Sequence, residues 1–149
     1  MANTFQLIIV TPERQVVLQD VEELTVPATG GYIGVLPGHT PLLATLKAGE
    51  VSFRRGTIHR YLAIGRGVVE VLPEKVTLLV VTAEPAEEID VDRATTARQQ
   101  AEKALAAMLR KALDDDTEFK QTEARLQRAV VRLQVARKGA AAPSSGHSA

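Results

Sequence analysis

Residues 76–112 read VTLLVVTAEPAEEIDVDRATTARQQAEKALAAMLRKA, and the character of the chain changes within this stretch. Up to residue 82 the apolar residues are Val and Leu in close succession, as in a buried strand. From Asp90 onward Ala recurs at spacings of three and four, which is the period of a helix. The change predicts a β domain up to Ala86 and an α domain beyond it.

The composition of the two parts agrees with this boundary. Eight of the 10 Gly and four of the five aromatic residues precede residue 87, whereas Ala, Arg, Gln and Glu dominate the rest. Gly suits tight turns between strands, and Ala and long straight side chains lose little entropy in a helix. We therefore predict an α+β chain, with an N-terminal antiparallel β-sandwich over residues 1–86 and a C-terminal α-helical hairpin over residues 87–138.

Short apolar runs with turn residues between them predict the strands of the sandwich. Their ranges are 5–10, 15–18, 23–26, 32–36, 51–54, 60–64, 68–71 and 76–82. Gly or Pro stands between most of them, which marks tight turns. Many short strands with frequent turns are typical of a sandwich or barrel and not of a parallel α/β sheet.

Two stripes of small and apolar residues at helical spacing define the hairpin. We expect Asp90 to cap the first helix, and the acidic run 114–116 to end the first stripe and cap the second helix. The stripes comprise Ala94, Ala97, Ala101, Ala104, Met108 and Ala112 on the first helix, and Phe119, Thr122, Leu126, Ala129, Leu133 and Ala136 on the second. Residues 139–149, rich in Ala, Ser and Gly, are expected to form a disordered tail.

The seam of this hairpin is thin, because each buried methyl group contributes only about 0.8 kcal/mol. The residues leave two interpretations open: an ordinary docked hairpin, or helices that persist while their packing changes. Arg125, Arg128 and Arg132 share one face of the second helix. Such a stripe suits an acidic protein surface or a phosphate group, and is equally compatible with a solvated face. We expect its removal to spare the packing of the hairpin.

Composition disfavours several functions. The 18 basic and 18 acidic residues balance, which argues against nucleic acid as a partner. The absence of Cys excludes disulfides and thiolate metal sites, and the three His lie far apart, so we expect no metal site. No segment approaches the roughly 20 apolar residues of a membrane span, so no direct membrane insertion is expected. No nucleophile with an orienting base stands out, so the chain is expected not to be an enzyme.

The most specific segment is GYIGVLPGHTPLL at residues 31–43, followed by Leu46 and Gly49. It resembles the signature G-x-x-G-x-x-P-G-H-x-P-L-L of the epsilon chain of F-type ATP synthases. The similarity continues through residues 67–71, 76–79 and 89–94. It covers most of the chain, from Phe5 to Lys138.

This resemblance implies a rotor subunit of the central stalk. The sandwich would bind the gamma shaft subunit and touch the membrane ring of c subunits, and the Gly31 to Gly34 turn would lie toward that ring. Tyr32 stands where some relatives carry an acidic residue. His39 would lie near the shaft or lock its own loop. The implied location is the cytoplasmic face of a bacterial inner membrane, as a peripheral part of the synthase.

The resemblance also implies a regulatory role for the hairpin. In this family the hairpin lies folded on the sandwich, or extends toward the alpha and beta subunits of the catalytic head and blocks ATP hydrolysis. The basic stripe of Arg125, Arg128 and Arg132 would then meet acidic segments of the head.

One segment is similar to the ATP-binding motif of some members of the family. No cofactor is required, and ATP would act as a regulatory ligand that stabilises the folded hairpin. Asp90 as a plain helix cap explains part of the motif without a ligand. The alternative for the whole chain is a free-standing β-sandwich adaptor or nucleotide-sensing module outside a rotary complex. The implied ATP contacts are Ile89, Asp90, Arg93, Ala94 and Arg98, with Arg125 or Arg128 from the second helix.

Overall fold

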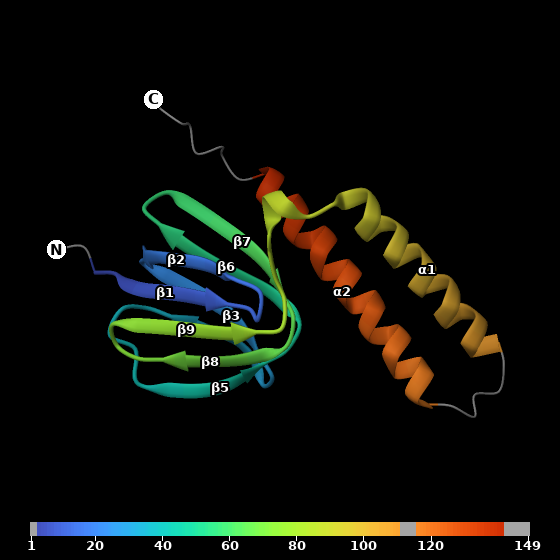
Figure 1. The fold of residues 1–149 in the computed structure, drawn as a ribbon, viewed down its shortest axis with the longest axis horizontal. Coiled ribbons are helices and arrows are strands. Elements are labelled where there is room, and N and C mark those ends of the chain that lie inside the picture. Colours follow the sequence, from blue (N-terminus) through green and yellow to red (C-terminus); the bar gives the residue numbers. More distant parts are fainter. Residues whose placement is uncertain (1–2, 111–115, 142–149) are drawn as a thin grey trace.

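The computed structural model describes residues 3–110 and 116–141. It consists of a β-sandwich with a pair of long helices at one end (Figure 1). The strands are β1 (Phe5–Val10), β2 (Gln15–Val21), β3 (Glu23–Ala28), β4 (Gly31–Val35), β5 (Leu42–Leu46), β6 (Gly49–Arg55), β7 (Ile58–Ile64), β8 (Gly67–Val71), β9 (Lys75–Val80) and β10 (Ala83–Pro85). The helices are the 3-10 helix η1 (Ala86–Glu88) and the α-helices α1 (Val91–Arg110) and α2 (Asp116–Ala141).

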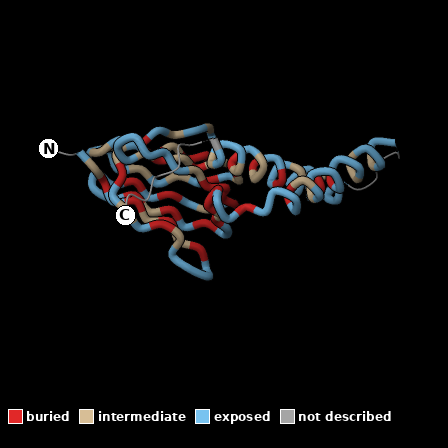
Figure 2. Tube along the Cα trace, turned by 90° about the horizontal axis from the view of Figure 1, so that it is seen from above, coloured by how far each residue is buried: buried red, intermediate tan, exposed pale blue. Residues whose placement is uncertain are grey.

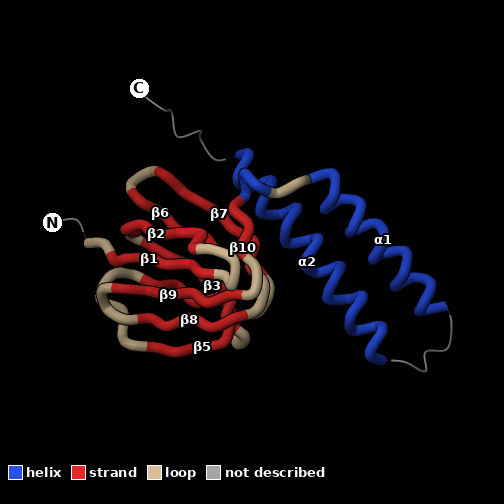
Figure 3. The backbone as a smooth tube through the Cα atoms, in the orientation of Figure 1, coloured by secondary structure: helices blue, strands red, loops and turns tan. Residues whose placement is uncertain are grey.

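The strands form one hydrogen-bonded path in the order β10-β7-β6-β3-β5-β8-β9-β1-β2, with β4 paired to β3 beside it. The path curls so that β2 packs near β6, and this closes the two layers of a sandwich (Figure 3). The predicted antiparallel β-sandwich is confirmed, with one exception to the antiparallel pairing, because β1 pairs with β9 in parallel. Such a pair needs a long connection, and here most of the β domain lies between its two strands.

The core follows from the alternation of side chains along each strand. In β1, for example, Phe5, Leu7 and Ile9 point inward and are buried, while the residues between them are exposed or half-buried. Leu24 and Leu78, from β3 and β9, are also fully buried in the same cluster. Figure 2 shows the buried residues concentrated in the sandwich and the larger part of the helices exposed. The sandwich is therefore held by a dry core of large aliphatic side chains.

Each of the eight predicted strands is found, most with one to three more residues at an end, while β4 and β9 end one and two residues before their predicted ends. Two strands were not predicted. The sequence of β5, Leu-Leu-Ala-Thr-Leu, contains good helix formers and gives no strong local preference for a strand. Its pairing with β8 along the whole strand decides its conformation. The strand β10 has only three residues and ends at Pro85, where local signals are weakest.

Within the described residues the expected cap of the hairpin is confirmed, and its seam in part, because Ala136, expected in the seam, packs against a small cluster at the sandwich. Asp90 Oδ1 accepts a hydrogen bond from the backbone N–H of Arg93 at 3.0 Å, so Asp90 caps α1. Ala94, Ala101, Thr122 and Ala129 are the buried residues of the seam. Ala112 and the first two residues of the acidic run lie outside the described residues, and α2 begins with the third, Asp116.

The prediction of a disordered tail from residue 139 is wrong at its start, because α2 continues to Ala141. Gly139 lies against η1 so closely that a Cβ added there would clash with Cβ of Ala86. A glycine in this position therefore serves close packing of the helix on the linker. Residues 142–149 lie outside the described residues.

A second face of α2 packs on the sandwich, and the sequence analysis did not identify it. Val131 and Val135 form a small core with Ala63 of β7, Ala86 of η1 and Ile89. We call this contact the joint. It holds α2 against the sandwich, whereas α1 packs chiefly against α2 (Figure 1).

Candidate functional site

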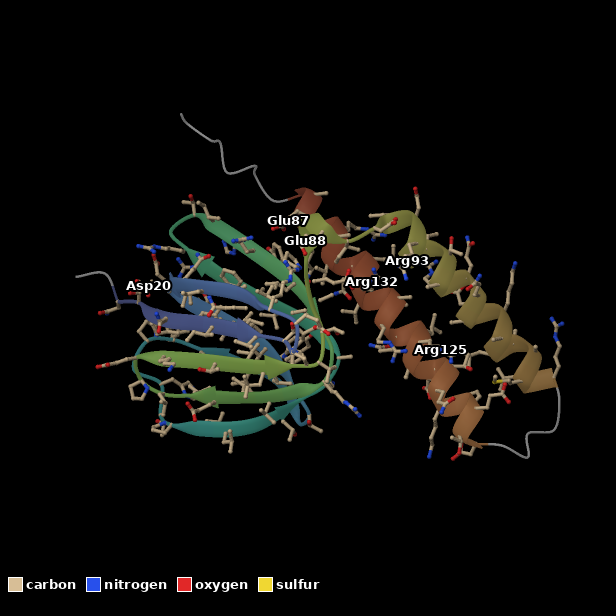
Figure 4. All side chains as sticks on the ribbon, in the orientation of Figure 1. Asp20, Glu87, Glu88, Arg93, Arg125 and Arg132 are labelled. Atoms are coloured by element: carbon tan, nitrogen blue, oxygen red, sulfur yellow. The ribbon has the colours of Figure 1, made fainter. Side chains whose placement is uncertain are left out.

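A cleft lies between the hairpin and the end of the sandwich, and its volume is about 740 Å³. Both helices and the strands β7 and β10 contribute to its walls. We call it the arginine cleft. Its charged or amide lining residues are Glu84, Arg93, Gln100, Arg125, Arg128 and Arg132. Figure 4 shows Arg93 on α1, with Arg125 and Arg132 on α2.

The charge balance of the cleft is strongly positive, since four guanidinium groups line it and Glu84 is the one carboxylate among its described lining residues. Arg93, Arg125 and Arg128 are exposed to solvent there. A guanidinium group presents several N–H donors in a plane that matches the oxygens of phosphate or carboxylate. The arrangement is therefore suited to a polyanion whose groups reach both helices.

The fourth arginine, Arg132, is engaged by the sandwich. Its Nε lies 2.9 Å from Glu84 Oε1, and its Nη2 donates to Glu84 Oε2 at 3.1 Å. The side chain of Arg132 is only 23% exposed. Of the two interpretations left open for the three-arginine stripe, the solvated face therefore does not hold for Arg132 in this conformation. Because α2 docks through its second apolar face, position 132 is turned toward β10.

The residues of the proposed ATP motif separate into two groups. Arg93, Arg125 and Arg128 meet at the cleft. Arg98 lies outside the lining, is half-exposed, and pairs with Glu102 one turn along α1, its Nε 3.1 Å from Oε1. The structure does not bring Arg98 to the other arginines.

The remaining motif residues have structural contacts. Ile89 is buried in the joint, and Ala94 is fully buried between the helices. Asp90 accepts the capping hydrogen bond described above. Sequence reasoning missed Glu84 and Gln100 as parts of the cleft. No local signal marks Glu84, because its strand was itself not predicted.

The residues predicted to contact partners lie at opposite ends of the sandwich. Tyr32, on β4, lies at the end near α2, since a Cβ added to Gly49, which adjoins the Lys138 partner Glu50, would lie 3.5 Å from its phenol oxygen. Gly34 follows on the same strand, which runs away from the hairpin. His39 belongs to the loop at the far end, where the N–H of Gly38 donates to the carbonyl of Pro73 at 2.9 Å.

The His39 loop is held by its own contacts. Nδ1 of His39 lies 2.7 Å from the carbonyl oxygen of Thr40, and its backbone N–H donates to Leu36 O at 3.2 Å. Around this loop Leu36, Leu43 and Leu72 expose apolar side chains. This cluster forms an apolar surface at the end of the sandwich opposite the hairpin.

Within the described ranges, neither α-helix is long and apolar enough to cross a membrane. In the same residues no group of three or more carboxylate or imidazole side chains is arranged to hold a metal ion.

Comparison with known families and structures defines the class of protein. The family model described as "ATP synthase, Delta/Epsilon chain, beta-sandwich domain" matches residues 4–86, and that described as "ATP synthase, Delta/Epsilon chain, long alpha-helix domain" matches residues 87–137. The chain belongs to the ATP synthase delta/epsilon family.

Individual relatives identify the type of chain. The chain is 47% identical over 139 residues to "ATP synthase epsilon chain 1" of Syntrophotalea carbinolica, covering 93% of this chain and 98% of the relative. It is 42% identical over 140 residues to the epsilon chain of Geotalea uraniireducens, covering 94% and 99%. Within the family, the chain is thus of the epsilon type, a non-catalytic subunit of the central stalk of an F-type ATP synthase. This assignment rules out the alternative of a free-standing adaptor outside a rotary complex.

Solved structures share the fold at much lower identity. A chain of the Euglena gracilis mitochondrial ATP synthase, in a structure of its OSCP/F1/c-ring, superposes with a TM-score of 0.72 at 20% identity, covering 95% of this chain and 83% of that one. A chain of the Tetrahymena thermophila mitochondrial ATP synthase central stalk and c-ring gives a TM-score of 0.58 at 12% identity, covering 89% and 96%. The sandwich with two C-terminal helices is therefore a fold found in ATP synthases.

Proposed function

We propose that the hairpin of this epsilon-type chain inhibits ATP hydrolysis when it leaves the sandwich, and that ATP bound in the arginine cleft keeps it folded. The observation that carries the proposal is the composition of the cleft. Arg93 comes from α1, Arg125 and Arg128 come from α2, and the floor comes from the sandwich. The site exists only while the hairpin is docked, so a ligand that binds there stabilises the docked state by mass action.

The thin seam between the helices supports the idea that bound ATP can shift the hairpin between its docked and extended states. Ala94, Ala101 and Ala129 bury little apolar area, so the two helices can separate at small cost, which supports docked and extended states that differ by only a few kcal/mol. A ligand of moderate affinity is enough to shift such an equilibrium. When α2 leaves the sandwich, its basic residues become available to the alpha and beta subunits of the catalytic head.

For assembly, we propose that the sandwich binds the gamma shaft subunit and the ring of c subunits. Support comes from the apolar surface around His39, with Leu36, Leu43 and Leu72 exposed, because such patches mark protein contacts. Tyr32 and Gly34 of β4 are proposed to take part as well. The chain is further proposed to work at the cytoplasmic face of a bacterial inner membrane, as a peripheral subunit, and its similarity to epsilon chains of bacteria supports this.

Nucleotide binding is tested on the full chain by thermal denaturation with increasing ATP up to millimolar concentration. We expect the melting temperature to rise, and the rise to disappear in Arg93→Ala and in the pair Arg125→Ala and Arg128→Ala. Arg98→Ala is the control: it belongs to the sequence motif but lies outside the cleft, so its shift should equal that of the wild type. A shift that survives loss of the cleft arginines would contradict the proposed site.

Inhibition is tested in the reconstituted synthase. We expect steady-state ATP hydrolysis to increase when the residues after Glu88 are removed, while binding to the gamma subunit persists through the sandwich. A pull-down of the same truncated chain measures that binding. Unchanged hydrolysis in fully assembled complexes would show that the hairpin is not an inhibitor.

A further inference from the structure

The ion pairs between α2 and the sandwich lie at two levels along the helix. Arg132 pairs with Glu84 at the cleft, and Lys138 pairs with Glu50 of β6 two turns further on. Between and beside them lies the small apolar core of Val131 and Val135. Along α2, Val135 lies between the two charged contacts, and Val131 immediately precedes Arg132.

The pair of Lys138 and Glu50 is the more buried of the two at its acidic end. Lys138 Nζ donates to Glu50 Oε2 at 2.7 Å, and it lies 5.9 Å from the centre of the Tyr61 ring, within the range of a cation–π contact. The side chain of Glu50 is only 12% exposed. Its other oxygen, Oε1, is buried and has no hydrogen-bond partner among the described residues.

Loss of the charge of Lys138 and loss of the charge of Glu50 therefore have unequal effects on the docking of α2. If Lys138 loses its charge, docking of α2 leaves a buried carboxylate with no compensating cation, which is strongly unfavourable. If Glu50 loses its charge, Lys138 is half-exposed and stays hydrated. The charged carboxylate of Glu50 thus makes docking of α2 unfavourable unless Lys138 forms an ion pair with it.

The charge of Lys138 is secure at neutral pH. Its hydrogen bond with Glu50 raises the pKa of Lys138 above its ordinary value of 10.5, against a smaller opposing effect of burial. A raised pKa of a basic group means that its stabilising contribution is complete below pH 10.5 and is lost only as the pH rises through the folded-state value. The strength of the ion pair between Lys138 and Glu50 therefore varies with ionic strength and not with pH in the physiological range.

The linker before α1 is held to the sandwich by other contacts. Glu88 pairs with Arg14, their closest atoms 2.6 Å apart, and Glu87 pairs with Arg60 at 2.9 Å. Neither pair involves α2. The helix can therefore leave the sandwich while η1 stays attached, which puts the pivot after Glu88.

We propose that Lys138–Glu50 and Arg132–Glu84 form an electrostatic latch that holds α2 on the sandwich, and that the hairpin turns about Ile89 and Asp90 when the latch opens. The inference rests on the proposed function in one respect, because it takes docking to be reversible. It adds a control that is independent of nucleotide: the latch weakens with salt and with any change that removes the charge of Lys138.

The test measures docking in the full chain without nucleotide or partners. Because the chain has no Cys, donor and acceptor dyes are attached at Asp20→Cys on β2 and Gln121→Cys on α2, both exposed positions. Fluorescence transfer then reports docked and undocked populations. We expect the undocked fraction of the wild type to rise between about 50 mM and about 1 M salt, over which charge screening becomes nearly complete.

The variants carry the decisive comparison. Lys138→Met should raise the ratio of undocked to docked molecules about tenfold, and Arg132→Met about threefold. Glu50→Gln alone should change it less than twofold, and Glu50→Gln in the Lys138→Met chain should restore most of the docking. This rescue is the signature of an uncompensated carboxylate, and a merely structural role of Lys138 would not produce it.

Arg98→Met is the matched control, because it breaks an ion pair of similar length within α1 that does not cross the joint. Arg14→Met, which removes one of the two ion pairs that hold the linker, should also leave docking unchanged. The latch is overturned if Lys138→Met and Arg132→Met behave like Arg98→Met, or if Glu50→Gln fails to rescue Lys138→Met. The pivot is overturned if Arg14→Met undocks α2 as strongly as Lys138→Met. Neither result bears on hydrolysis by the assembled synthase, so failure of the latch and failure of hairpin inhibition remain distinguishable.

Discussion

The sandwich and the hairpin bury different kinds of side chain. The sandwich core contains Leu7, Leu24 and Leu78 at zero exposure, each worth about 1.5–3 kcal/mol by burial. The seam of the hairpin is closed mainly by Ala101 and Ala129, whose single methyl groups bury far less. The comparison teaches that the sandwich is stable through its own core, whereas the hairpin depends on the joint and its charges to stay in place.

The largest expected effect tests the sandwich side of this comparison. Leu24→Ala removes a fully buried side chain from the core, so the free energy of unfolding should fall by about 2–5 kcal/mol. Urea denaturation of the full chain measures it. Leu18→Ala, at a side chain that is 54% exposed, is the control and should stay within about 0.5 kcal/mol of wild type. Similar losses in both would contradict the assignment of the core.

The next effect tests the joint. Val135→Ala empties part of the small core between α2 and the sandwich, where Val135 has no exposed surface. We expect a loss of about 1–3 kcal/mol, confined to docking. Amide hydrogen exchange should therefore quicken along α2 and stay unchanged in β1 and β9. The neighbouring Val130→Ala, on an exposed side chain, should change neither. Equal acceleration across the sandwich would show that hairpin and sandwich unfold together.

A smaller effect is expected at the end of α2, where a Gly→Ala substitution should destabilise docking and not stabilise the helix. Gly→Ala within a helix normally stabilises it by about 0.5–1 kcal/mol. At Gly139 the added Cβ would clash with Cβ of Ala86, so we expect Gly139→Ala to weaken docking by about 1 kcal/mol. The dye pair described above measures this. Ala86→Gly in the same chain should restore docking, and a stabilising effect of Gly139→Ala alone would refute the close approach.

The smallest effect concerns a charged cluster on the sandwich surface. The N–H of Gly56 donates to Glu22 Oε1 at 2.9 Å, and Arg54 Nη1 donates to Oε2 at 3.0 Å. These contacts, that of Gly56 first, lower the pKa of Glu22 below its ordinary value of 4.5. A lowered pKa means stability that is present above pH 4.5 and is lost as the pH falls through the folded-state value.

Glu22→Gln should therefore lower the stability of the sandwich slightly at pH 7 and flatten its dependence on pH below about 4.5, so that the two chains converge in acid. Thermal melts of both chains across pH 3–7 check this, and hairpin docking should not follow the change. An unaltered acid profile would mean that the pair contributes nothing to folding.

Local chemistry made much of this fold predictable. Gly and Pro marked most of the turns, the alternation of side chains marked the strands, and the spacing of Ala marked the helices. The cap at Asp90 was predictable because the interaction spans only three residues. The motif at residues 31–43 pointed to the family, which the comparisons confirm.

What could not be read from the chain involves partners distant in sequence. The strand β5 and the parallel pairing of β1 with β9 depend on which strands meet across the sandwich. Helical periodicity identified one apolar face of α2, but Val131 and Val135 acquire their role only against Ala63 and Ile89. Whether an arginine side chain is exposed or forms an ion pair likewise depends on which distant segment packs beside it.

The arginines illustrate the division between the two kinds of information. Their spacing along α2 established that Arg125, Arg128 and Arg132 share a face, because helical geometry is local. Only the folded chain separates Arg132, which meets Glu84 of β10 at 2.9 Å, from Arg125 and Arg128, which stay exposed in the cleft. It also brings Arg93 to them and leaves Arg98 with Glu102. The physical reason is that periodicity determines a side chain's direction on its own helix, while packing between distant segments determines what it faces.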